Sequence, residues 1–335
     1  MHVKKTIDPK RYMDGRITVM GVAAILITWF HCDVIITPGS LLELFKLTGD
    51  IGVDMFLFAS GAGIYLAANK YPSYFEYLYR RVRRVLIPYL CVYVPVYSYE
   101  RVMFGGGYSR FLKRILLLDF WLEGDLGNWY IAGILLLYII TPLWIKLWKK
   151  HRWVYAGTFS AVLVGYIFLR NAPGIIHWNI FLCRIPVYLL GLAFGKLLLE
   201  KRKLEVSLLL SVGAVLCGVV LILAAMGRLP VGIPGAYKCL AYLPVAVGLS
   251  LLLAKLPSNK FTNYFGVRSL EIYLVFETVQ EMVHSLPQME VFAGNTKIML
   301  AIFSLTITLV AVEILCLLCK LIDKTLDKMV SYIKK

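Results

Sequence analysis

The stretch TWFHCD, residues 28–33, places His31 and Asp33 near the end of the first long apolar segment. An imidazole titrates near neutral pH and suits a general base. His31 lies 15 residues after Arg16, which is about 22 Å of helical rise. Lipid would not solvate a histidine at that depth, so the ring must face protein or a wet cavity. Two interpretations follow, a general base or a neutral histidine hydrogen-bonded to a neighbouring helix.

Other titratable residues also interrupt apolar segments. Residues 49–67, GDIGVDMFLFASGAGIYLA, carry Asp54 together with glycines that allow close approach between helices. Arg184 lies inside a later apolar segment, where a guanidinium needs an anionic partner. Residues 77–90, YLYRRVRRVLIPYL, hold a basic cluster of four arginines, which are Arg80, Arg81, Arg83 and Arg84. Members three apart, such as Arg81 and Arg84, share a helical face.

The composition of the chain indicates that membrane helices position these residues. The chain has 335 residues, of which 59% are hydrophobic and only 17% charged. Soluble domains carry about a quarter charged residues, so the sequence predicts an all-α polytopic membrane bundle. We expect a single transmembrane domain over residues 1–335, with a cytoplasmic lead at 1–16 and a basic cytoplasmic tail at 321–335. Seven dispersed cysteines indicate neither a disulfide framework nor a metal site.

Hydropathy divides the chain into about ten membrane spans. A further short apolar piece, residues 109–122, is amphipathic and too short to cross, so we expect it to lie in the membrane interface. The expected spans are residues 18–37, 48–69, 85–104, 128–147, 153–171, 178–199, 205–226, 232–254, 264–285 and 297–320.

The distribution of basic residues sets the orientation. With a cytoplasmic N-terminus, 26 of the 36 lysines and arginines fall in cytoplasmic segments. This bias predicts that both termini are cytoplasmic. The net charge of +16 is spread over many loops, so it reflects topology and does not predict nucleic-acid binding.

Five landmarks in order resemble the acyltransferase-3 family of integral-membrane O-acyltransferases. They are the histidine of the first helix, GVDMFLFASG at 52–61, RRVRRVLIP at 80–88, GNWYIAGILLLY at 127–138 and SLEIYLVFE at 269–277. The resemblance covers nearly the whole chain. It implies a cell-membrane enzyme that moves an acyl group, commonly acetyl, from cytosolic acyl-CoA to a hydroxyl of an extracytoplasmic glycan, lipid-linked or other envelope acceptor, with no metal.

Two positions depart from the family pattern. The family typically has an arginine eleven residues before the histidine, where this chain has Met20; Arg16 lies one turn earlier on roughly the same face. The family histidine of the ninth span is replaced by Phe276, which Glu277 follows. Both changes leave room for altered substrate geometry or lost catalysis.

Four residues are catalytic candidates for such an acyl transfer. His31 either deprotonates the acceptor hydroxyl or carries the acyl group covalently. Arg184 either stabilises the oxyanion or forms a structural ion pair. Asp54 either orients a catalytic group or bonds between helices. Glu277 either replaces the missing histidine as an acid–base group or pairs with Arg184.

The cytosolic donor requires cations for its phosphates, and guanidinium groups suit bidentate phosphate contact. The alternative for the basic cluster is a topological signal that contacts anionic lipids. Trp129 is either a site residue or an interface anchor, and Ser269 either contacts the donor or caps a helix. The candidate donor-binding residues are Arg16, Arg80, Arg81, Arg83, Arg84, Trp129 and Ser269.

Two other classes of function compete with acyl transfer. A transporter or flippase would also combine many spans with buried charges, although this sequence lacks the two-halved internal repeat typical of such proteins. A catalytically silent sensor or assembly partner is favoured by Met20 and Phe276. Turnover and binding of acyl-CoA distinguish the enzyme from both. Membrane lipids are the remaining expected partners.

Overall fold

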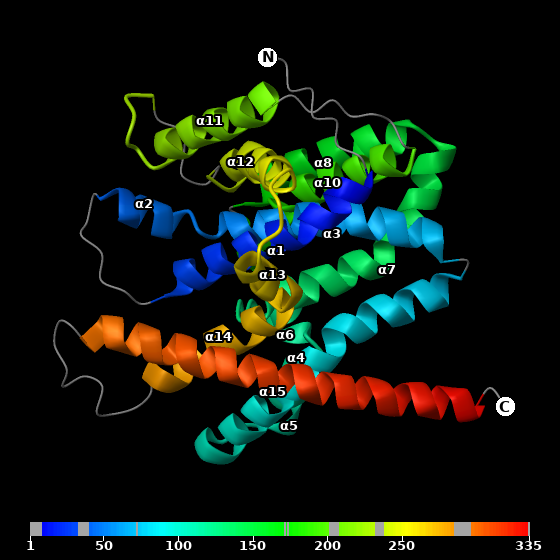
Figure 1. Ribbon diagram of the computed structural model, residues 1–335, viewed down its shortest axis with the longest axis vertical. Coiled ribbons are helices and arrows are strands. Elements are labelled where there is room, and N and C mark those ends of the chain that lie inside the picture. The colour runs from blue at the N-terminus through cyan, green and yellow to red at the C-terminus, as the bar shows by residue number, and fades with distance from the viewer. Residues whose placement is uncertain are drawn as a thin grey trace. The chain divides into compact units, whose positions relative to one another are not determined.

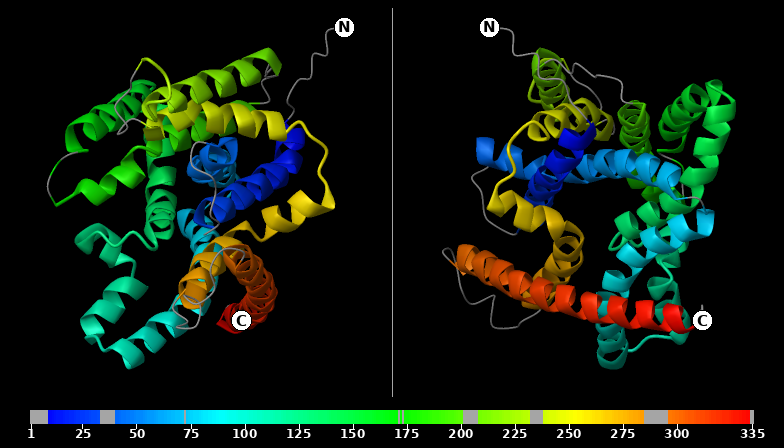
Figure 2. Two further views of the ribbon diagram at one scale, coloured as in Figure 1. Left: turned by 90° about the vertical axis from the view of Figure 1, so that its left-hand side faces the viewer. Right: turned by 45° about the vertical axis from the view of Figure 1, so that its right-hand side comes forward.

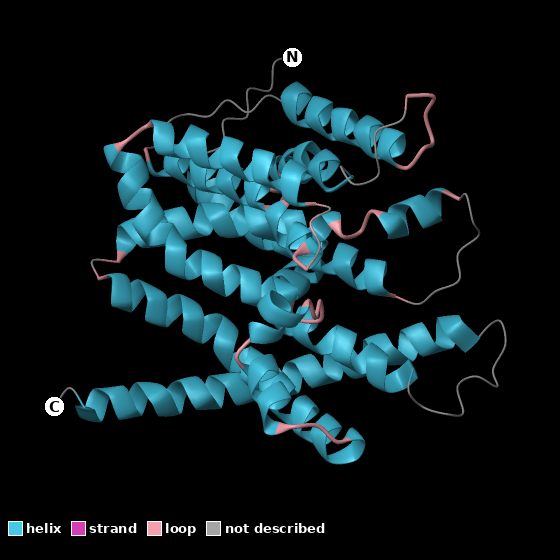
Figure 3. Ribbon diagram, turned by 180° about the vertical axis from the view of Figure 1, so that it is seen from behind, coloured by secondary structure: helices cyan, strands magenta, loops and turns pink. Residues whose placement is uncertain are grey.

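A computed structural model describes residues 9–32, 40–71, 73–170, 172, 174–200, 208–231, 238–284 and 296–333. Within these ranges the regular elements are all helices (Figures 1 and 3). In chain order they are α1 (Pro9–His31), α2 (Leu41–Leu47), α3 (Ile51–Lys70), α4 (Tyr74–Phe104), α5 (Tyr108–Ile115), α6 (Leu118–Glu123), α7 (Trp129–Lys150), α8 (Trp153–Leu169), η1 (Ile176–Trp178), α9 (Asn179–Leu182), α10 (Ile185–Leu199), α11 (Leu208–Ala225), α12 (Lys238–Leu253), α13 (Lys260–Val267), α14 (Ser269–His284) and α15 (Thr296–Ile333).

Six helical segments of the described residues are long and apolar enough to cross a membrane. They lie in α1, α3, α7, η1 to α10, α11 and α15. The other predicted spans fall on α4, whose N-terminal half is charged, on the shorter apolar helices α8 and α12, and on α13 and α14. The membrane-helix class is therefore confirmed, while the number ten and the orientation stay predictions.

The chain forms two compact units, each built from three separate stretches of sequence. Two of the boundaries between them fall within α1 and within α4. The first unit comprises residues 1–23, 51–81 and 117–267, and the second comprises residues 24–50, 82–116 and 268–335.

Helix α3 is the centre of the first unit, and α10 and α12 pack against it (Figure 1). Nearly all of α3 is buried, as expected for a helix that is apolar on all sides. Small residues bring its backbone close to α10. A Cβ on Gly191 would lie 2.2 Å from the carbonyl oxygen of Phe58, and one on Gly61 would lie 2.5 Å from that of Tyr188. The close approach predicted from the glycines of this segment is thus confirmed for Gly61.

Gly191→Ala is expected to destabilise the first unit, because the backbone atom that the new methyl group meets cannot rotate away. Overpacking of this kind costs about 1–3 kcal/mol. The thermal unfolding midpoint of detergent-purified protein measures the effect. Gly165→Ala in α8 is the matched control, since a Cβ there meets nothing within 4 Å. Equal midpoints for both variants would contradict the close packing of α3 on α10.

Glycines also allow close backbone contact between other segments of the first unit. Helices α11 and α12 lie side by side (Figure 2), and a Cβ on Gly248 would lie 2.7 Å from the carbonyl oxygen of Ser211. The first half of α1 is equally close to the chain after α12, because a Cβ on Gly15 would lie 2.3 Å from the carbonyl oxygen of Ala254. The polar end of α1 is therefore held firmly within this unit.

In the second unit α14 packs along α15, and ion pairs fix both helices. Arg268 Nε lies 2.7 Å from Glu313 Oε1, which joins the residue before α14 to α15. Arg83 on α4 lies 2.5 Å from Asp323 and 2.6 Å from Asp327, both on α15. These carboxylates lie one turn apart, so one guanidinium binds both.

The structure adds detail to three expected segments, of which 178–199 lies within one candidate span, Ile176–Leu199. The segment 109–122 is not one interfacial helix but two, α5 and α6, separated where Leu117 adopts a left-handed backbone with φ of 59°. The expected span 178–199 is interrupted between α9 and α10, just before Pro186. Helix α10 restarts at Ile185, and Pro186 lies in its first turn, where proline is favoured. Helix α4 continues unbroken through the expected loop before residue 85.

Candidate active site

Two arginines from distant parts of the sequence meet on α3 in the first unit. Arg16 Nε donates to the carbonyl oxygen of Ala59 at 3.2 Å, and Arg81 Nη2 donates to that of Gly63 at 3.0 Å. Both guanidiniums contact the same glycine, because a Cβ on Gly63 would lie 3.5 Å from Arg16 Cζ. Each is an electrostatic neighbour of the other. We call Arg16 and Arg81 the arginine pair.

Buried tyrosines surround the arginine pair. Tyr12 is an electrostatic neighbour of Arg16, and Tyr77 is one of Arg81. Both rings are at most 1% exposed, and neither hydroxyl has a hydrogen-bond partner among the described residues. Burial raises the pKa of Tyr77 above its ordinary value. Its hydroxyl therefore stays protonated at neutral pH and can donate a hydrogen bond.

This arrangement fits an anion. Among the described residues the hydrogen-bond partners of the arginine pair are backbone carbonyls, and no carboxylate is paired with either guanidinium. Two adjacent positive charges with only dipoles as partners repel each other. An entering phosphate would accept hydrogen bonds from both guanidiniums and relieve that repulsion. The tyrosine hydroxyls are further donors for the same group.

A second cluster in the same unit unites three of the predicted site residues. Arg184 Nε lies 3.7 Å from Asp54 Oδ2, and both side chains are at least 96% buried. The Arg184 guanidinium also lies over the Trp129 ring, 5.1 Å from its centroid, and donates to the carbonyl oxygen of Ile180 at 3.0 Å. The cluster therefore draws on α3, on the start of α7 and on the break before α10.

Asp54→Asn is expected to destabilise the protein, because it leaves the Arg184 charge buried beside a neutral side chain. Breaking a buried ion pair from one side costs about 3–5 kcal/mol. Arg184→Gln should cost less, because a carboxyl group can take up a proton whereas a guanidinium cannot release one. The double variant should recover part of the loss. Thermal unfolding midpoints of the three variants measure this order, and equal midpoints for all would contradict a buried pair.

His31 ends α1 in the second unit, where its side chain is exposed. Its ring packs edge-on against Phe30 with centroids 5.0 Å apart, and Asp50 is an electrostatic neighbour. Asp33 lies outside the described residues.

The remaining members of the basic cluster bind carboxylates of the protein. Arg80 pairs with Glu76 one turn earlier at 3.2 Å on the exposed side of α4. Arg84 Nη1 lies 2.7 Å from Glu271 Oε1, whose side chain is only 2% exposed. Arg83 pairs with two carboxylates of α15, as described above.

The other two predicted residues lie on α14 in the second unit. Ser269 begins that helix and is buried, two residues before the partner of Arg84. Glu277 is half-buried and is an electrostatic neighbour of Tyr93 on α4. Arg184, in the first unit, has Asp54 as a carboxylate partner, which corresponds to the structural ion pair that was one of its two expected roles.

The sequence interpretation missed Tyr12 and Tyr77. Each lies four residues before a member of the arginine pair, one helical turn away on the same face. The same four-residue spacing between a tyrosine and an arginine occurs in both segments, and it is the feature of the sequence that could have indicated these two tyrosines. An aromatic residue in an apolar segment is usually core, so the signal acquires meaning only when the two segments meet on α3.

Comparison with protein families gives one match. A family model described as an acyltransferase domain matches residues 19–318 of the chain. The matched stretch includes His31, Asp54, Arg81 and Arg184, while Arg16 lies three residues before it. No curated protein and no solved structure matches the chain.

Proposed function

Because the chain belongs to the acyltransferase-3 family, we propose that it is an integral-membrane O-acyltransferase that uses cytosolic acyl-CoA. Its acceptor is a hydroxyl of an extracytoplasmic glycan or another envelope molecule, and acetyl is the group that it moves. The protein crosses the plasma membrane several times with both termini in the cytoplasm. A family match over most of the chain supports acyl transfer, and the side-chain arrangement supports the choice of donor.

The arginine pair is the observation that carries the donor assignment. Acyl-CoA is an anion with several phosphates, and Arg16 and Arg81 present two guanidiniums that lack carboxylate partners among the described residues. Guanidinium groups match phosphate oxygens in pairs. Tyr12 and Tyr77 supply hydroxyls beside them. We assign the arginine pair to the donor phosphates. Arg83 and Arg84, which form ion pairs with carboxylates, are assigned to holding α15 and α14 in place.

His31 has the proton-transfer role in this proposal. A ring nitrogen of His31 takes the proton of the acceptor hydroxyl while the hydroxyl oxygen attacks the thioester carbonyl carbon. Collapse of the tetrahedral intermediate breaks the carbon–sulfur bond, and the CoA thiolate leaves and takes up the proton.

Arg184 has the charge-stabilising role, and Asp54 positions it. A buried guanidinium held by a carboxylate at 3.7 Å and by a tryptophan face keeps a fixed orientation. A preorganised cation of this kind stabilises developing oxyanion charge without reorganising during the reaction. Trp129 therefore acts through Arg184, as a positioning residue.

Competition binding tests the donor assignment. Detergent-purified protein is expected to bind radiolabelled acetyl-CoA, and free CoA should displace it because CoA carries the same phosphates. Pantetheine has the thiol arm without the nucleotide phosphates, so it should not compete at the same concentration. Equal competition by pantetheine and CoA would overturn the assignment of the arginine pair to the phosphates. Absence of acetyl-CoA binding would overturn the donor itself and favour a transporter or an assembly partner.

A further inference from the structure

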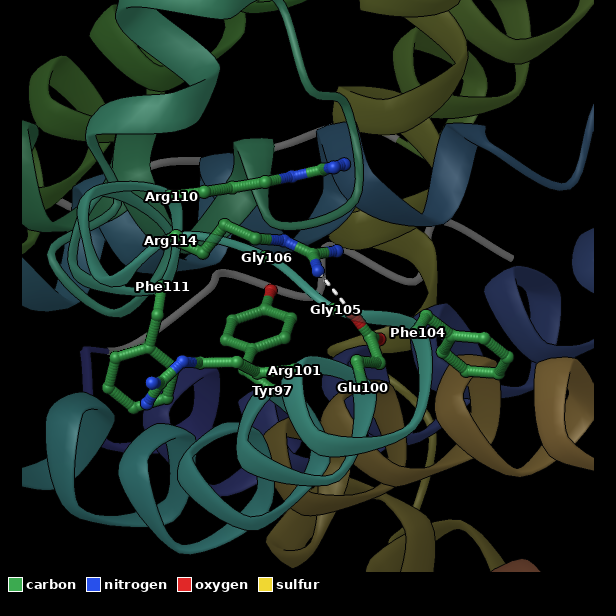
Figure 4. Close-up of a pocket in the computed structure, with 10 residues that line it drawn as sticks. Tyr97, Glu100, Arg101, Phe104, Gly105, Gly106, Arg110, Phe111 and Arg114 are labelled. Atoms are coloured by element: carbon green, nitrogen blue, oxygen red, sulfur yellow. Dashed lines mark hydrogen bonds and ion pairs between the residues drawn. The ribbon is translucent and has the colours of Figure 1, made fainter.

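A pocket of about 280 Å³ lies within the second unit, where the end of α4 turns into α5 (Figure 4). Three glycines form the turn, and Gly105 has a left-handed backbone with φ of 75°. This turn gives the pocket a wall of bare backbone. Arg101, Arg110 and Arg114 are its basic side chains, and Glu100 is its one acidic side chain.

The charges in the pocket do not balance. Arg114 forms an ion pair with Glu100 and lies over the Tyr97 ring, 4.0 Å from its centroid. Arg110 extends beside Arg114 and has no hydrogen-bond or ion-pair partner among the described residues (Figure 4). Arg101 stacks on the Tyr108 ring at 3.3 Å, and its buried Nε has no partner in the described part of the chain. Arg110 and Arg101 therefore both line the pocket without a carboxylate partner in the described part of the chain, and their side chains run in different directions (Figure 4).

The two helices that form the pocket carry exposed apolar side chains, of which Phe104 lines the pocket itself. Val102 and Phe104 at the end of α4 are 82% and 80% exposed, and Tyr108 and Leu112 on α5 are 68% and 52% exposed. Helix α5 buries none of its residues, although it carries Phe111, Leu112 and Ile115 beside its two arginines. Apolar side chains next to guanidiniums are typical of a helix that lies among lipid headgroups.

We propose that this pocket binds a phosphate ester. A phosphate fits because Arg110 and Arg101 offer guanidinium donors with no carboxylate partner, and because guanidinium binds phosphate oxygens in pairs. The exposed apolar side chains of α4 and α5 beside these arginines favour the headgroup of an anionic phospholipid as the source of this ester. This binding is independent of acyl transfer, since none of the residues that line the pocket takes part in the proposed reaction.

Lipid retention tests the proposal. Purified protein is exchanged into equal amounts of phosphatidylglycerol and phosphatidylcholine, and the lipids that remain bound are counted by native mass spectrometry. Wild-type protein should retain phosphatidylglycerol in preference. Arg110→Gln and, separately, Arg101→Gln should lower that retention about tenfold. Arg152→Gln removes the same charge from an exposed residue that does not line the pocket, and it should behave as wild type.

A variant that is expected to increase lipid retention distinguishes lost phosphate contacts from misfolding. Glu100→Gln removes the one negative charge of the pocket and releases Arg114 from its ion pair, so it should raise phosphate retention severalfold. Glycerol 3-phosphate distinguishes the sources of the ester. Displacement of phosphatidylglycerol by millimolar glycerol 3-phosphate would assign the site to soluble phosphate esters, and no displacement would assign it to lipid. Equal retention of both lipids, or no change in any variant, would overturn the proposal.

Discussion

His31→Ala is expected to abolish acyl transfer while leaving protein level and membrane insertion unchanged. Removing a general base lowers a rate by about 10²- to 10⁴-fold, and removing a covalent carrier would lower it at least as much. The exposed position of His31 at the end of α1 makes loss of packing a minor effect. Release of free CoA from acetyl-CoA by membranes that contain the native acceptor measures the rate.

His151→Ala is the matched control for this prediction. His151 is exposed at the end of α7 and has no part in the proposed reaction. The control should keep the wild-type rate of CoA release at an equal amount of protein in the membrane. Wild-type release by His31→Ala, measured in the same membranes, would remove this histidine from the mechanism and with it the assignment of proton transfer.

Arg81→Gln is expected to weaken acetyl-CoA binding by about tenfold or more, because a charge-assisted hydrogen bond to phosphate contributes about 1.5–3 kcal/mol. Arg16→Gln should weaken binding to a similar extent, since its guanidinium contacts the same glycine of α3. The two effects should not be additive if one phosphate bridges both guanidiniums. Equilibrium binding of radiolabelled acetyl-CoA to purified variants gives the dissociation constants.

The neighbouring Arg80 provides a sharp comparison on the same helix. Its guanidinium is paired with Glu76 on the exposed face of α4, whereas that of Arg81 reaches the backbone of α3. Arg81→Gln should therefore weaken acetyl-CoA binding far more than Arg80→Gln does. Equal effects would mean that the cluster acts through its total charge, as the topological and lipid-contact alternative holds.

Two buried charged residues of the first unit were recognised from the sequence. Asp54 and Arg184 were singled out because charges in apolar segments need partners, and the structure places them 3.7 Å apart. The identity of each partner was not readable, since it depends on which helices touch. Gly61 and Gly191 bring α3 and α10 together, and that pairing is a property of packing across more than a hundred residues of chain.

The basic cluster shows the same limit. Its four arginines share one short stretch of α4, and the periodicity predicted shared faces for residues three apart. In the structure the four side chains contact four different partners, namely Glu76, the backbone of α3, the acidic end of α15 and Glu271. Arginine side chains are long and flexible, so their final direction depends on the nearest carboxylate or carbonyl and not on helical phase alone.

Helix boundaries were predicted least well. A polar stretch ends a membrane span in a hydropathy plot without ending the helix, so α4 and α15 extend well beyond the predicted apolar segments. The reverse happens at Leu117, where a run of apolar residues conceals a left-handed turn between α5 and α6. Such a turn depends on the local fit of the backbone, and leucine gives no warning of it.

Mass spectrometry of envelope polymers tests the central claim most directly, because a lost ester is detected whichever molecule is the acceptor. Cells that carry the wild-type gene, cells that lack it and cells that carry His31→Ala are compared for base-labile acyl esters. We expect an ester that is present with the wild-type gene and absent from both of the other strains. The same esters in all three strains would contradict acyl transfer to an envelope hydroxyl by this protein.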